Sequence, residues 1–306
     1  MKLVHTSCPL CGSLGDYKVI YDQNFETADI NVDTFSARRL PDRVHYRIVK
    51  CNKDGLLRAD PVLDKTTVED FYSKSKFNYE KQIKNLTSSY MQALEQVLKR
   101  LNQNARILEI GCGNGFLLTE LLKRGYKNIF GIEPSKQAVL KADGSLQASI
   151  KTSFLTPGIF EKGCFDFIFF FQTFDHVDAP VEFLQTCYDL LVPGGYVLCF
   201  NHDAESLSSK LLGEKSPIVD IEHPFLYSKK TIKKIFEARG FVTLKIYSPY
   251  NRISLSYFLW LLPLGKRFKE YILKARSGFL NWFLSLNFSL RLGNLCIIAI
   301  KPAEEG

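Results

Sequence analysis

The segment that most constrains this chain is residues 107–122, which have the sequence ILEIGCGNGFLLTELL. An apolar run contains the acidic residue Glu109, passes through three glycines at alternate positions, and continues as an amphipathic helix. Glycine at 111, 113 and 115 lets the backbone bend sharply and approach a ligand closely. Free amides at the N-terminus of the helix would face the same turn. The pattern predicts a strand, a tight turn and a helix that together bind a ligand.

A second acidic residue ends the next expected strand. Glu133 stands in the segment GIEPS at 131–135, 18 residues beyond Gly115. A carboxylate at this place can accept hydrogen bonds from the two hydroxyls of a ribose. We therefore expect the chain to bind a nucleoside.

The glycine spacing distinguishes between classes of nucleoside ligand. A dinucleotide-binding turn would have its third glycine at 116, where this chain has Phe116. Glu109 would also crowd a diphosphate with negative charge, whereas it suits an amino group or a sulfonium. The spacing E-x-G-x-G-x-G resembles motif I of the class I S-adenosylmethionine-dependent methyltransferases. The alternative is a nicotinamide or flavin enzyme with a variant turn.

The resemblance covers about residues 105–245. It continues through FDFIFFFQTFDHV at 165–177 and LLVPGGYVLCF at 190–200. It implies S-adenosylmethionine as the cofactor. The cofactor-binding residues that it implies are Glu109, Gly111, Cys112, Gly113, Gly115, Glu133, Pro134 and Gln172.

Alternation of strand and helix patterns predicts an α/β fold. We expect a Rossmann-like, seven-stranded, mostly parallel sheet with helices on both faces, because strands such as FDFIFFF are apolar throughout. The expected strands are 105–110, 128–133, 147–152, 165–171, 195–201, 241–248 and 294–301. The expected helices are 67–101, 115–124, 135–142, 179–191 and 228–239. In the family, the last two strands pair antiparallel at the sheet edge.

These patterns divide the chain into four parts. Residues 1–65 form an N-terminal subdomain resembling a zinc ribbon, and 66–104 form a helical linker. Residues 105–248 and 294–306 form the methyltransferase domain. The 45 residues between the last two strands, 249–293, are too many for a hairpin loop and predict a helical insertion.

Cysteines near the N-terminus suggest a metal site. CPLCGS at 8–13 places two thiolates two residues apart, a spacing typical of half a zinc knuckle. The best second half is CNKDGL at 51–56, in which Asp54 stands where a fourth cysteine is expected. The arrangement resembles the N-terminal region of a subset of class I methyltransferases that act on sugars and other small molecules. The alternatives are a structural zinc held by Cys8, Cys11, Cys51 and Asp54, a vestigial site without metal, and coincidence.

Methyl transfer to an oxygen acceptor needs alignment and a base. Base candidates should follow the strands, because ligands bind at the carboxyl ends of parallel strands. Gln172, Asp175 and His176 follow the fourth strand, and Asn201, His202 and Asp203 follow the fifth. His223 stands in DIEHPFLYS, within a segment that also matches the family subset. We predict His223 as the base, with His202 and Asp203 as further candidates, and we expect His176 to have a packing or capping role.

The insertion combines aromatic and basic residues. Between 229 and 276 there are 12 Lys and Arg against two Glu, whereas the whole chain carries +8. Such a segment can contact a membrane surface or lipid through 253–283, or cover the acceptor pocket as a lid, or form a dimer face. We predict the lid. MKLVHTSCPL lacks the apolar run of a signal peptide, so we expect a cytoplasmic protein, with peripheral membrane contact as an open alternative.

The leading hypothesis is a methyltransferase for a small-molecule acceptor such as a nucleotide- or lipid-linked sugar or a prenyl-type lipid. The alternative is an RNA methyltransferase with an N-terminal zinc knuckle. Against nucleic acid as a partner, the base-stacking tetrapeptides N-P-P-Y and D-P-P-Y are replaced by FQTFD at 171–175. A third class is a paralogue without activity, which the intact glycine turn disfavours. The oligomeric state does not follow from the sequence.

Overall fold

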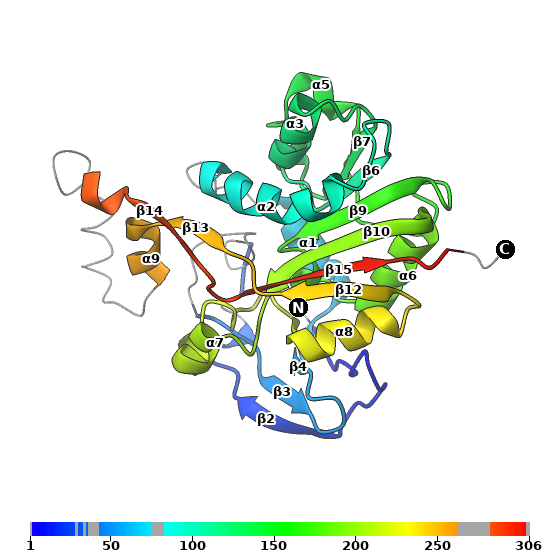
Figure 1. Cartoon of the computed structure of the whole chain (residues 1–306). Coiled ribbons are helices and arrows are strands. Elements are labelled where there is room, and N and C mark those ends of the chain that lie inside the picture. The colour runs from blue at the N-terminus through cyan, green and yellow to red at the C-terminus, as the bar shows by residue number, and fades with distance from the viewer. Residues whose placement is uncertain are drawn as a thin grey trace.

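A seven-stranded sheet forms the centre of the computed structural model, which describes residues 2–27, 30–32, 35, 43–74, 83–261 and 282–303. Its strand order is β12-β15-β10-β9-β6-β7-β8 (Figure 1). The strands are β6 (Ile107–Ile110), β7 (Ile129–Ile132), β8 (Ile150–Lys151), β9 (Phe165–Phe171), β10 (Leu191–His202), β12 (Val242–Tyr247) and β15 (Asn294–Ile300). Strands β6 to β10 pair in parallel, and β15 runs antiparallel to β10 and β12. The predicted Rossmann-like sheet is confirmed.

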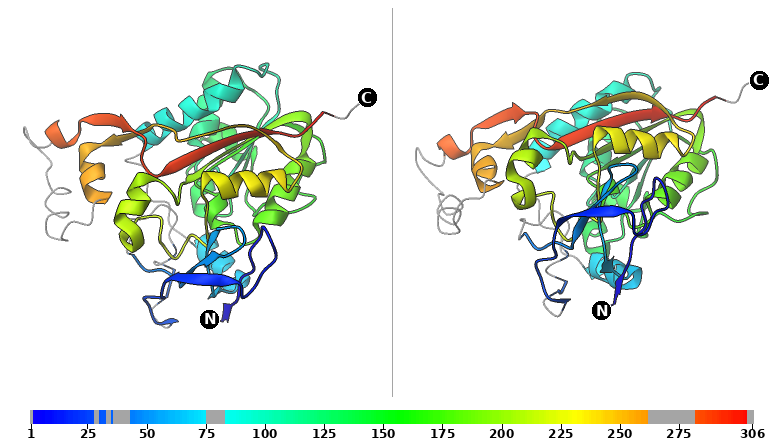
Figure 2. Two further views of the ribbon diagram at one scale, coloured as in Figure 1. Left: turned by 60° about the horizontal axis from the view of Figure 1, so that its bottom comes forward. Right: turned by 90° about the horizontal axis from the view of Figure 1, so that it is seen from below.

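Helices cover both faces of this sheet (Figures 1 and 2). One face carries α2 (Ile83–Leu98), α3 (Phe116–Lys123), α4 (Lys136–Val139) and α5 (Gly144–Gln147). The opposite face carries α6 (Pro180–Leu190) and α8 (Lys229–Glu237). The strand expected at 147–152 is shorter than predicted, because α5 continues to Gln147.

Strand β9 shows why the sheet is buried on both sides. Phe167, Phe169 and Phe171 pack into the core under α2 and α3, whereas Ile168 and Phe170 pack into the core under α6 and α8. Each of these side chains is at most 2% exposed. Burying an apolar side chain of this size contributes roughly 1.5–3 kcal/mol, so β9 anchors the two helical layers to each other.

The N-terminal residues form a second, smaller sheet with the order β11-β4-β3-β2. Its strands are β2 (Tyr17–Tyr21), β3 (Ile48–Cys51), β4 (Leu57–Ala59) and β11 (Phe225–Leu226). β1 (Leu3–Val4) pairs separately with β5 (Val62–Leu63), and α1 (Lys65–Lys74) follows. Strand β11 comes from the connection after β10, so this connection joins the N-terminal sheet. The sequence patterns did not predict that pairing.

The connection between β10 and β11 contains α7 (Leu207–Leu212) and the short helical turn η4 (Gly213–Lys215). Another short turn, η3 (Phe174–His176), follows β9 directly. These connections leave the carboxyl ends of β9 and β10, which is the edge of the sheet where ligands bind in such folds.

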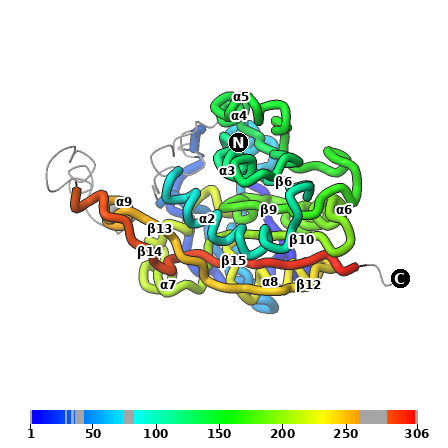
Figure 3. The backbone as a smooth tube through the Cα atoms, turned by 45° about the horizontal axis from the view of Figure 1, so that its top comes forward, coloured from blue at the N-terminus to red at the C-terminus, as the bar shows by residue number. Residues whose placement is uncertain are grey.

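The insertion between β12 and β15 differs in part from the expected helical segment. It contains the predicted helix as α9 (Leu255–Leu261), but β13 (Asn251–Ser254) and β14 (Asn287–Leu290) pair antiparallel and were not predicted. Figure 3 shows this strand pair projecting beyond the end of the central sheet, next to α7. Residues 262–281 lie outside the described part of the chain. Within that part, no helix is both long enough and apolar enough to cross a bilayer.

Candidate active site

The glycine turn after β6 has the expected conformation. Gly111, Gly113 and Gly115 all have positive φ, at 74°, 57° and 70°. A Cβ added at Gly111 would lie 2.5 Å from Thr173 Oγ1, so a larger residue there would displace the turn that follows β9. Gly115 is the N-cap of α3, whose N-terminus faces the turn. Glycine is therefore required here both by backbone conformation and by close packing.

Glu133 connects the glycine turn to the next strand. Its carboxylate accepts hydrogen bonds from the N–H groups of Gly113 and Ser135, both at 2.8 Å. The residue is 9% exposed and lines a cavity. A carboxylate accepts hydrogen bonds from hydroxyls as well as from N–H groups, so Glu133 is suited to contact a ligand hydroxyl.

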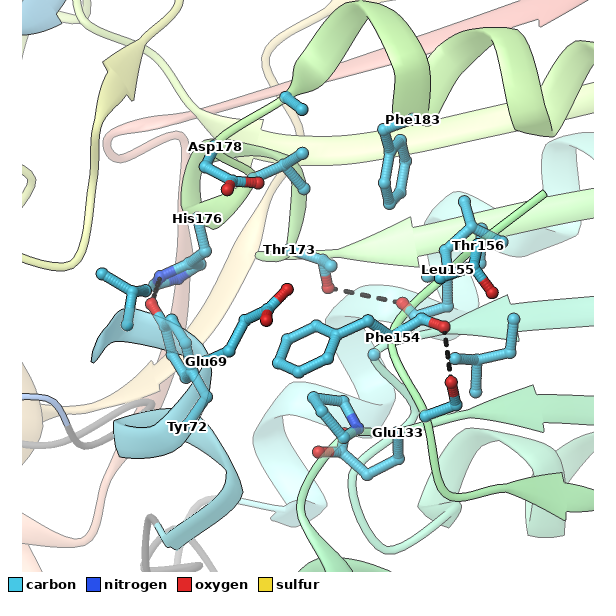
Figure 4. Close-up of a pocket in the computed structure, with 18 of the residues that line it drawn as sticks. Glu69, Tyr72, Glu133, Phe154, Leu155, Thr156, Thr173, His176, Asp178 and Phe183 are labelled. Carbon is cyan, nitrogen blue, oxygen red and sulfur yellow. Dashed lines mark hydrogen bonds between the residues drawn. The ribbon is translucent and has the colours of Figure 1, made fainter. Parts of the chain in front are cut away.

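A cavity of about 470 Å³ opens at the carboxyl ends of β6, β7 and β9. Among its lining residues are five of the eight predicted cofactor-binding residues: Gly111, Gly113, Glu133, Pro134 and Gln172. Figure 4 shows the Glu133 and Phe154 side chains beside this space. Glu109, Cys112 and Gly115 do not line it. Cys112 is buried and packs against Gly131, where an added Cβ would lie 2.7 Å from its sulfur.

Helix α1 forms one wall of the cavity, through Lys65, Val68, Glu69 and Tyr72. Glu69 and Tyr72 lie opposite Phe154 and Thr173 in Figure 4. We expected the insertion to cover the acceptor pocket, but none of its described residues, 249–261 and 282–293, lines the cavity. Helix α1, which packs against residues of the N-terminal region, lines this edge instead.

Two residues that follow neighbouring parallel strands meet at this edge of the sheet. His202 Nδ1 lies 2.5 Å from Asp175 Oδ2. Burial alone would raise the pKa of the Asp175 carboxyl, but the imidazoles of His202, His223 and His176 outweigh burial and hold that pKa well below its usual range. An ionised Asp175 only accepts hydrogen bonds, so His202 donates from Nδ1 and keeps Nε2 as its basic nitrogen.

Two further histidines pack against this pair. The rings of His176 and His223 are 4.6 Å apart, and those of His202 and His223 are 4.9 Å apart. His223 Nδ1 donates to the main-chain oxygen of Ile218 at 2.9 Å. Burial, together with the neighbouring His176, lowers the pKa of His223 to about 3. His223 is therefore neutral and a weak base at physiological pH.

His176 is the histidine of this cluster that lines the cavity. Its Nδ1 lies 3.0 Å from the hydroxyl of Tyr72 in α1, as Figure 4 shows. We expected a packing role for His176, but its side chain lines the cavity. Asp175 and His176 could be found from the sequence because they closely follow an apolar strand, whereas no sequence pattern indicated Tyr72.

Asp203 has different surroundings from the histidines. Its carboxylate accepts the N–H of Glu205 at 3.0 Å in a local turn, and its own N–H donates to the oxygen of Gly293 at 2.7 Å. Burial raises the pKa of its carboxyl. These contacts fit a residue that shapes the connection after β10.

The predicted metal ligands near the N-terminus converge in space. One ligand atom from each of Cys8, Cys11, Cys51 and Asp54 lies within 4.8 Å of all the others. The sulfur atoms of Cys11 and Cys51 are 3.6 Å apart, and Cys8 Sγ is 3.9 Å from Asp54 Oδ2. Zinc bonds of 2.3 Å in a tetrahedron require ligand separations of about 3.8 Å. The predicted convergence is confirmed.

The two halves of this cluster have matching backbone turns. The N–H of Gly12 donates to the oxygen of Cys8 at 2.8 Å, and the N–H of Gly55 donates to the oxygen of Cys51 at 2.9 Å. Both glycines have positive φ. Asp54 thus occupies the position of a cysteine in the second of two equivalent knuckles. Its other oxygen, Oδ1, accepts a hydrogen bond from Lys234 of α8 at 3.1 Å.

Comparison with known proteins agrees with the glycine turn and the fold. The sequence profile of a methyltransferase domain family matches residues 79–246, more than half of the chain. This chain belongs to that methyltransferase family. S-adenosylmethionine is the cofactor expected of the family.

The names of individual relatives give different activities. An uncharacterized methyltransferase of Bacillus pumilus is 27% identical over 65% of this chain and 93% of its own length. A ubiquinone biosynthesis O-methyltransferase of Ralstonia nicotianae is 32% identical over 30% of this chain and 41% of its own length. A tRNA U34 carboxymethyltransferase of Vibrio cholerae is 27% identical over 47% of each chain. The chain thus spans less than half of the last two relatives.

Solved methyltransferase structures are similar at low sequence identity. One from Archaeoglobus fulgidus gives a TM-score of 0.49 at 19% identity and covers 78% of this chain and 100% of its own. Phosphoethanolamine N-methyltransferase 2 of Haemonchus contortus, in complex with S-adenosylmethionine, gives 0.48 at 17% identity and covers 76% and 60%.

Proposed function

We propose that this methyltransferase acts on a small-molecule acceptor and uses His202, oriented by Asp175, to take the acceptor's proton. The observation that carries this proposal is the 2.5 Å contact between His202 and Asp175. Neither side chain lines the cavity itself; His202 is connected to it through the rings of His223 and His176. A positioned imidazole is the commonest group for this task, and removing one lowers the rate by about 10²–10⁴-fold.

The residues of the cavity fit S-adenosylmethionine. Gly111 and Gly113 line the cavity without side chains, and Glu133 can accept hydrogen bonds from ribose hydroxyls. Glu133, Pro134, Gly111 and Gly113 would hold this cofactor. When bound, it supplies an electrophilic methyl group on a positively charged sulfur.

Each residue of the histidine cluster has a different task in the proposed transfer. His202 Nε2 receives the proton of an acceptor hydroxyl, while Asp175 holds the ring by Nδ1 and balances the charge that the imidazole gains. His176 and Tyr72 form the wall of the cavity on this side and contact the acceptor. We assign His223, which is buried and weakly basic, to orienting its two neighbours, instead of the base role predicted from sequence.

Charges in the cavity favour a small molecule over RNA. Glu69, Asp178 and Glu182 line it, and Lys65 is the only lining Lys or Arg in the described chain. Lys65 also lies 3.7 Å from Glu69, which offsets its charge. These carboxylates would repel a phosphodiester backbone close to the reacting group, whereas they can accept hydrogen bonds from sugar hydroxyls or an amine. A nucleotide- or lipid-linked sugar would place its sugar here and its anionic part outside.

We also propose a structural zinc ion at Cys8, Cys11, Cys51 and Asp54. The matching turns and ligand separations support it. A carboxylate is a harder ligand than thiolate, so the affinity should be lower than that of a four-cysteine site. This cluster lies beside α8, to which Asp54 is hydrogen bonded, and it would have no part in the chemistry.

Peripheral membrane contact through the insertion is the remaining part of the proposal. Trp282 is 58% exposed and Phe283 44% exposed, and Leu207 and Leu211 of the adjacent α7 are each at least 75% exposed. Exposed aromatic and leucine side chains of this kind insert into the interfacial region of a bilayer. This surface would bring the enzyme to a lipid-linked acceptor.

Labelled methyl transfer from S-adenosylmethionine into cell extract, followed by separate counting of lipid, nucleotide-sugar and RNA fractions, tests the acceptor class. We expect the label in a lipid or nucleotide-sugar fraction, and its loss in a His202→Gln variant. Label confined to RNA would overturn the small-molecule proposal. Full activity of His202→Gln with loss in His176→Gln would move the base assignment to His176.

A further inference from the structure

Gln172 has an unusual backbone conformation for its residue type. Its φ of 50° places it in the left-handed region, which only Arg43 shares among the non-glycine residues of the described chain. It directly follows β9 and precedes η3, and its N–H donates to the oxygen of Phe200 in β10 at 2.8 Å. A left-handed residue with a Cβ costs free energy. Glycine would adopt this turn more readily, so the glutamine side chain should provide something that glycine cannot.

The Gln172 side chain begins a chain of three hydrogen bonds between amides. Gln172 Nε2 donates to Asn294 Oδ1 at 3.1 Å, and Asn294 Nδ2 donates to Asn251 Oδ1 at 2.9 Å. Asn251 Nδ2 then donates to the main-chain oxygen of Leu292 at 2.7 Å. We call Gln172, Asn294 and Asn251 the amide relay. Because a carbonyl oxygen only accepts, Leu292 sets the direction of every amide in the relay.

The amide relay joins the two strand ends that carry the proposed base. Asn294 is the first residue of β15 and lies directly opposite His202 in the β10–β15 ladder. Gln172 starts the turn that contains Asp175, three residues further along the chain. Asn251 is the first residue of β13, so the relay also reaches the base of the inserted strand pair. Three parts of the chain separated by many residues are thus tied together beside the proposed active site.

We propose that Asn294 and Asn251 are positioning residues, which act through Gln172 to keep Asp175 within hydrogen-bonding distance of His202. The amide relay keeps Gln172 in its left-handed conformation, and that conformation sets where η3 begins. The hydrogen bond between Asp175 and His202 therefore depends on a correctly folded insertion, although the described insertion does not line the cavity. This inference rests on the proposed function, because it concerns the same proton-accepting pair.

The tautomer of His202 reports on this pair directly. When Asp175 is within hydrogen-bonding distance of His202, its carboxylate keeps the proton of His202 on Nδ1. Multiple-bond proton–nitrogen NMR of ¹⁵N-histidine-labelled protein observes the ring nitrogens through carbon-bound protons that do not exchange with water. The full chain has five histidines, and the His202→Gln variant identifies the His202 signals by their loss.

Two variants remove the amide relay in different ways. Asn294→Leu removes the central amide. Asn251→Leu removes the outer amide, at the start of β13, so it tests the relay even if Asn294→Leu does not fold. The matched control is Asn85→Leu, which removes a 2.7 Å hydrogen bond from α2 to Asn287 of the same inserted strand pair but leaves the relay intact.

We expect wild type and Asn85→Leu to show His202 with its proton on Nδ1. Asn251→Leu and Asn294→Leu should show a mixture of both tautomers, with melting temperatures close to that of the control. An unchanged Nδ1–H tautomer in a folded Asn294→Leu or Asn251→Leu variant would overturn the inference, since Asp175 and His202 would then stay paired without the relay. Calorimetry with S-adenosylhomocysteine on the wild type separates the two proposals. Absence of binding would contradict the proposed function, whereas the tautomer result tests the relay alone.

Discussion

His202 Nδ1 and Asp175 Oδ2 lie 2.5 Å apart although 27 positions separate the two residues in the chain. They meet because β9 and β10 are parallel neighbours, so the residues that follow both strands emerge at one edge of the sheet. The carboxylate is fully buried and ionised, and the imidazole that it orients is partly exposed. This combination is suited to proton abstraction from a bound acceptor.

Replacing His202 with Gln should lower methyl transfer by about 10²–10⁴-fold, because the proton acceptor is lost. Asp175→Asn should also lower turnover, since an amide does not stabilise the imidazolium. Affinity for S-adenosylhomocysteine, measured by calorimetry, should be nearly unchanged in both, because neither residue is among those expected to hold the cofactor. His5→Gln is the control, because the His5 side chain is 72% exposed. Equal turnover in His202→Gln and the control would remove His202 from the mechanism.

Replacing Glu133 with Ala should weaken binding of S-adenosylhomocysteine by tenfold or more, because a hydrogen bond to a charged group contributes about 1.5–3 kcal/mol. The loss has two sources: the ribose contact, and the hydrogen bonds that Glu133 accepts from Gly113 and Ser135. Calorimetry measures the affinity, and the half-exposed Glu120 provides a matched Ala variant. An affinity unchanged in Glu133→Ala would contradict the predicted cofactor site.

Replacing Gly111 with Ala should lower the free energy of unfolding by about 1–3 kcal/mol, as expected for strained backbone. A further loss should come from the clash with Thr173. Gly158→Ala separates the two effects, because Gly158 has φ of 82° and no atom near its added Cβ. We expect urea denaturation to show a larger loss for Gly111→Ala. Equal losses would mean that Thr173 moves aside without cost.

Metal analysis should find one zinc ion per chain, and Cys11→Ser should abolish it. Because thiolate is a softer ligand than carboxylate, Asp54→Cys should bind zinc more tightly than the wild type. Competition with a chromophoric chelator measures both affinities. Cys164→Ser, at a half-buried cysteine outside the cluster, should retain the metal. A metal-free wild type that also takes up no added zinc would make the cluster vestigial.

A double variant, Trp282→Ser with Phe283→Ser, should reduce co-sedimentation with anionic lipid vesicles. The change removes two exposed aromatic side chains that would insert between headgroups. Leu140→Ser is the control, because Leu140 is 61% exposed and lies on α4's side of the sheet. If the wild type stays in the supernatant, the membrane contact is wrong.

Local patterns in the sequence determined most of the central fold. The apolar run of β9 and the alternating glycines after β6 constrain neighbouring residues, so their strand, turn and helix follow from positions close together in the chain. The same holds for the two knuckles, since each places its pair of ligands within four residues. Asp54 could be predicted as a ligand because the residues around it match those around the second cysteine of the first knuckle.

Contacts between distant residues were decided only by the tertiary structure. Tyr72 reaches His176 because the N-terminal sheet sets α1 over the cavity, and no periodicity in α1 encodes that placement. The choice of base also depended on the fold, because burial makes His223 a weak base whereas Asp175 orients the partly exposed His202. The sequence by itself determined the strands of the central sheet, the glycine turn and the residue types available for chemistry. Which of those residues meet, and with what proton affinity, depends on burial and packing, which arise only when segments far apart in the chain come together.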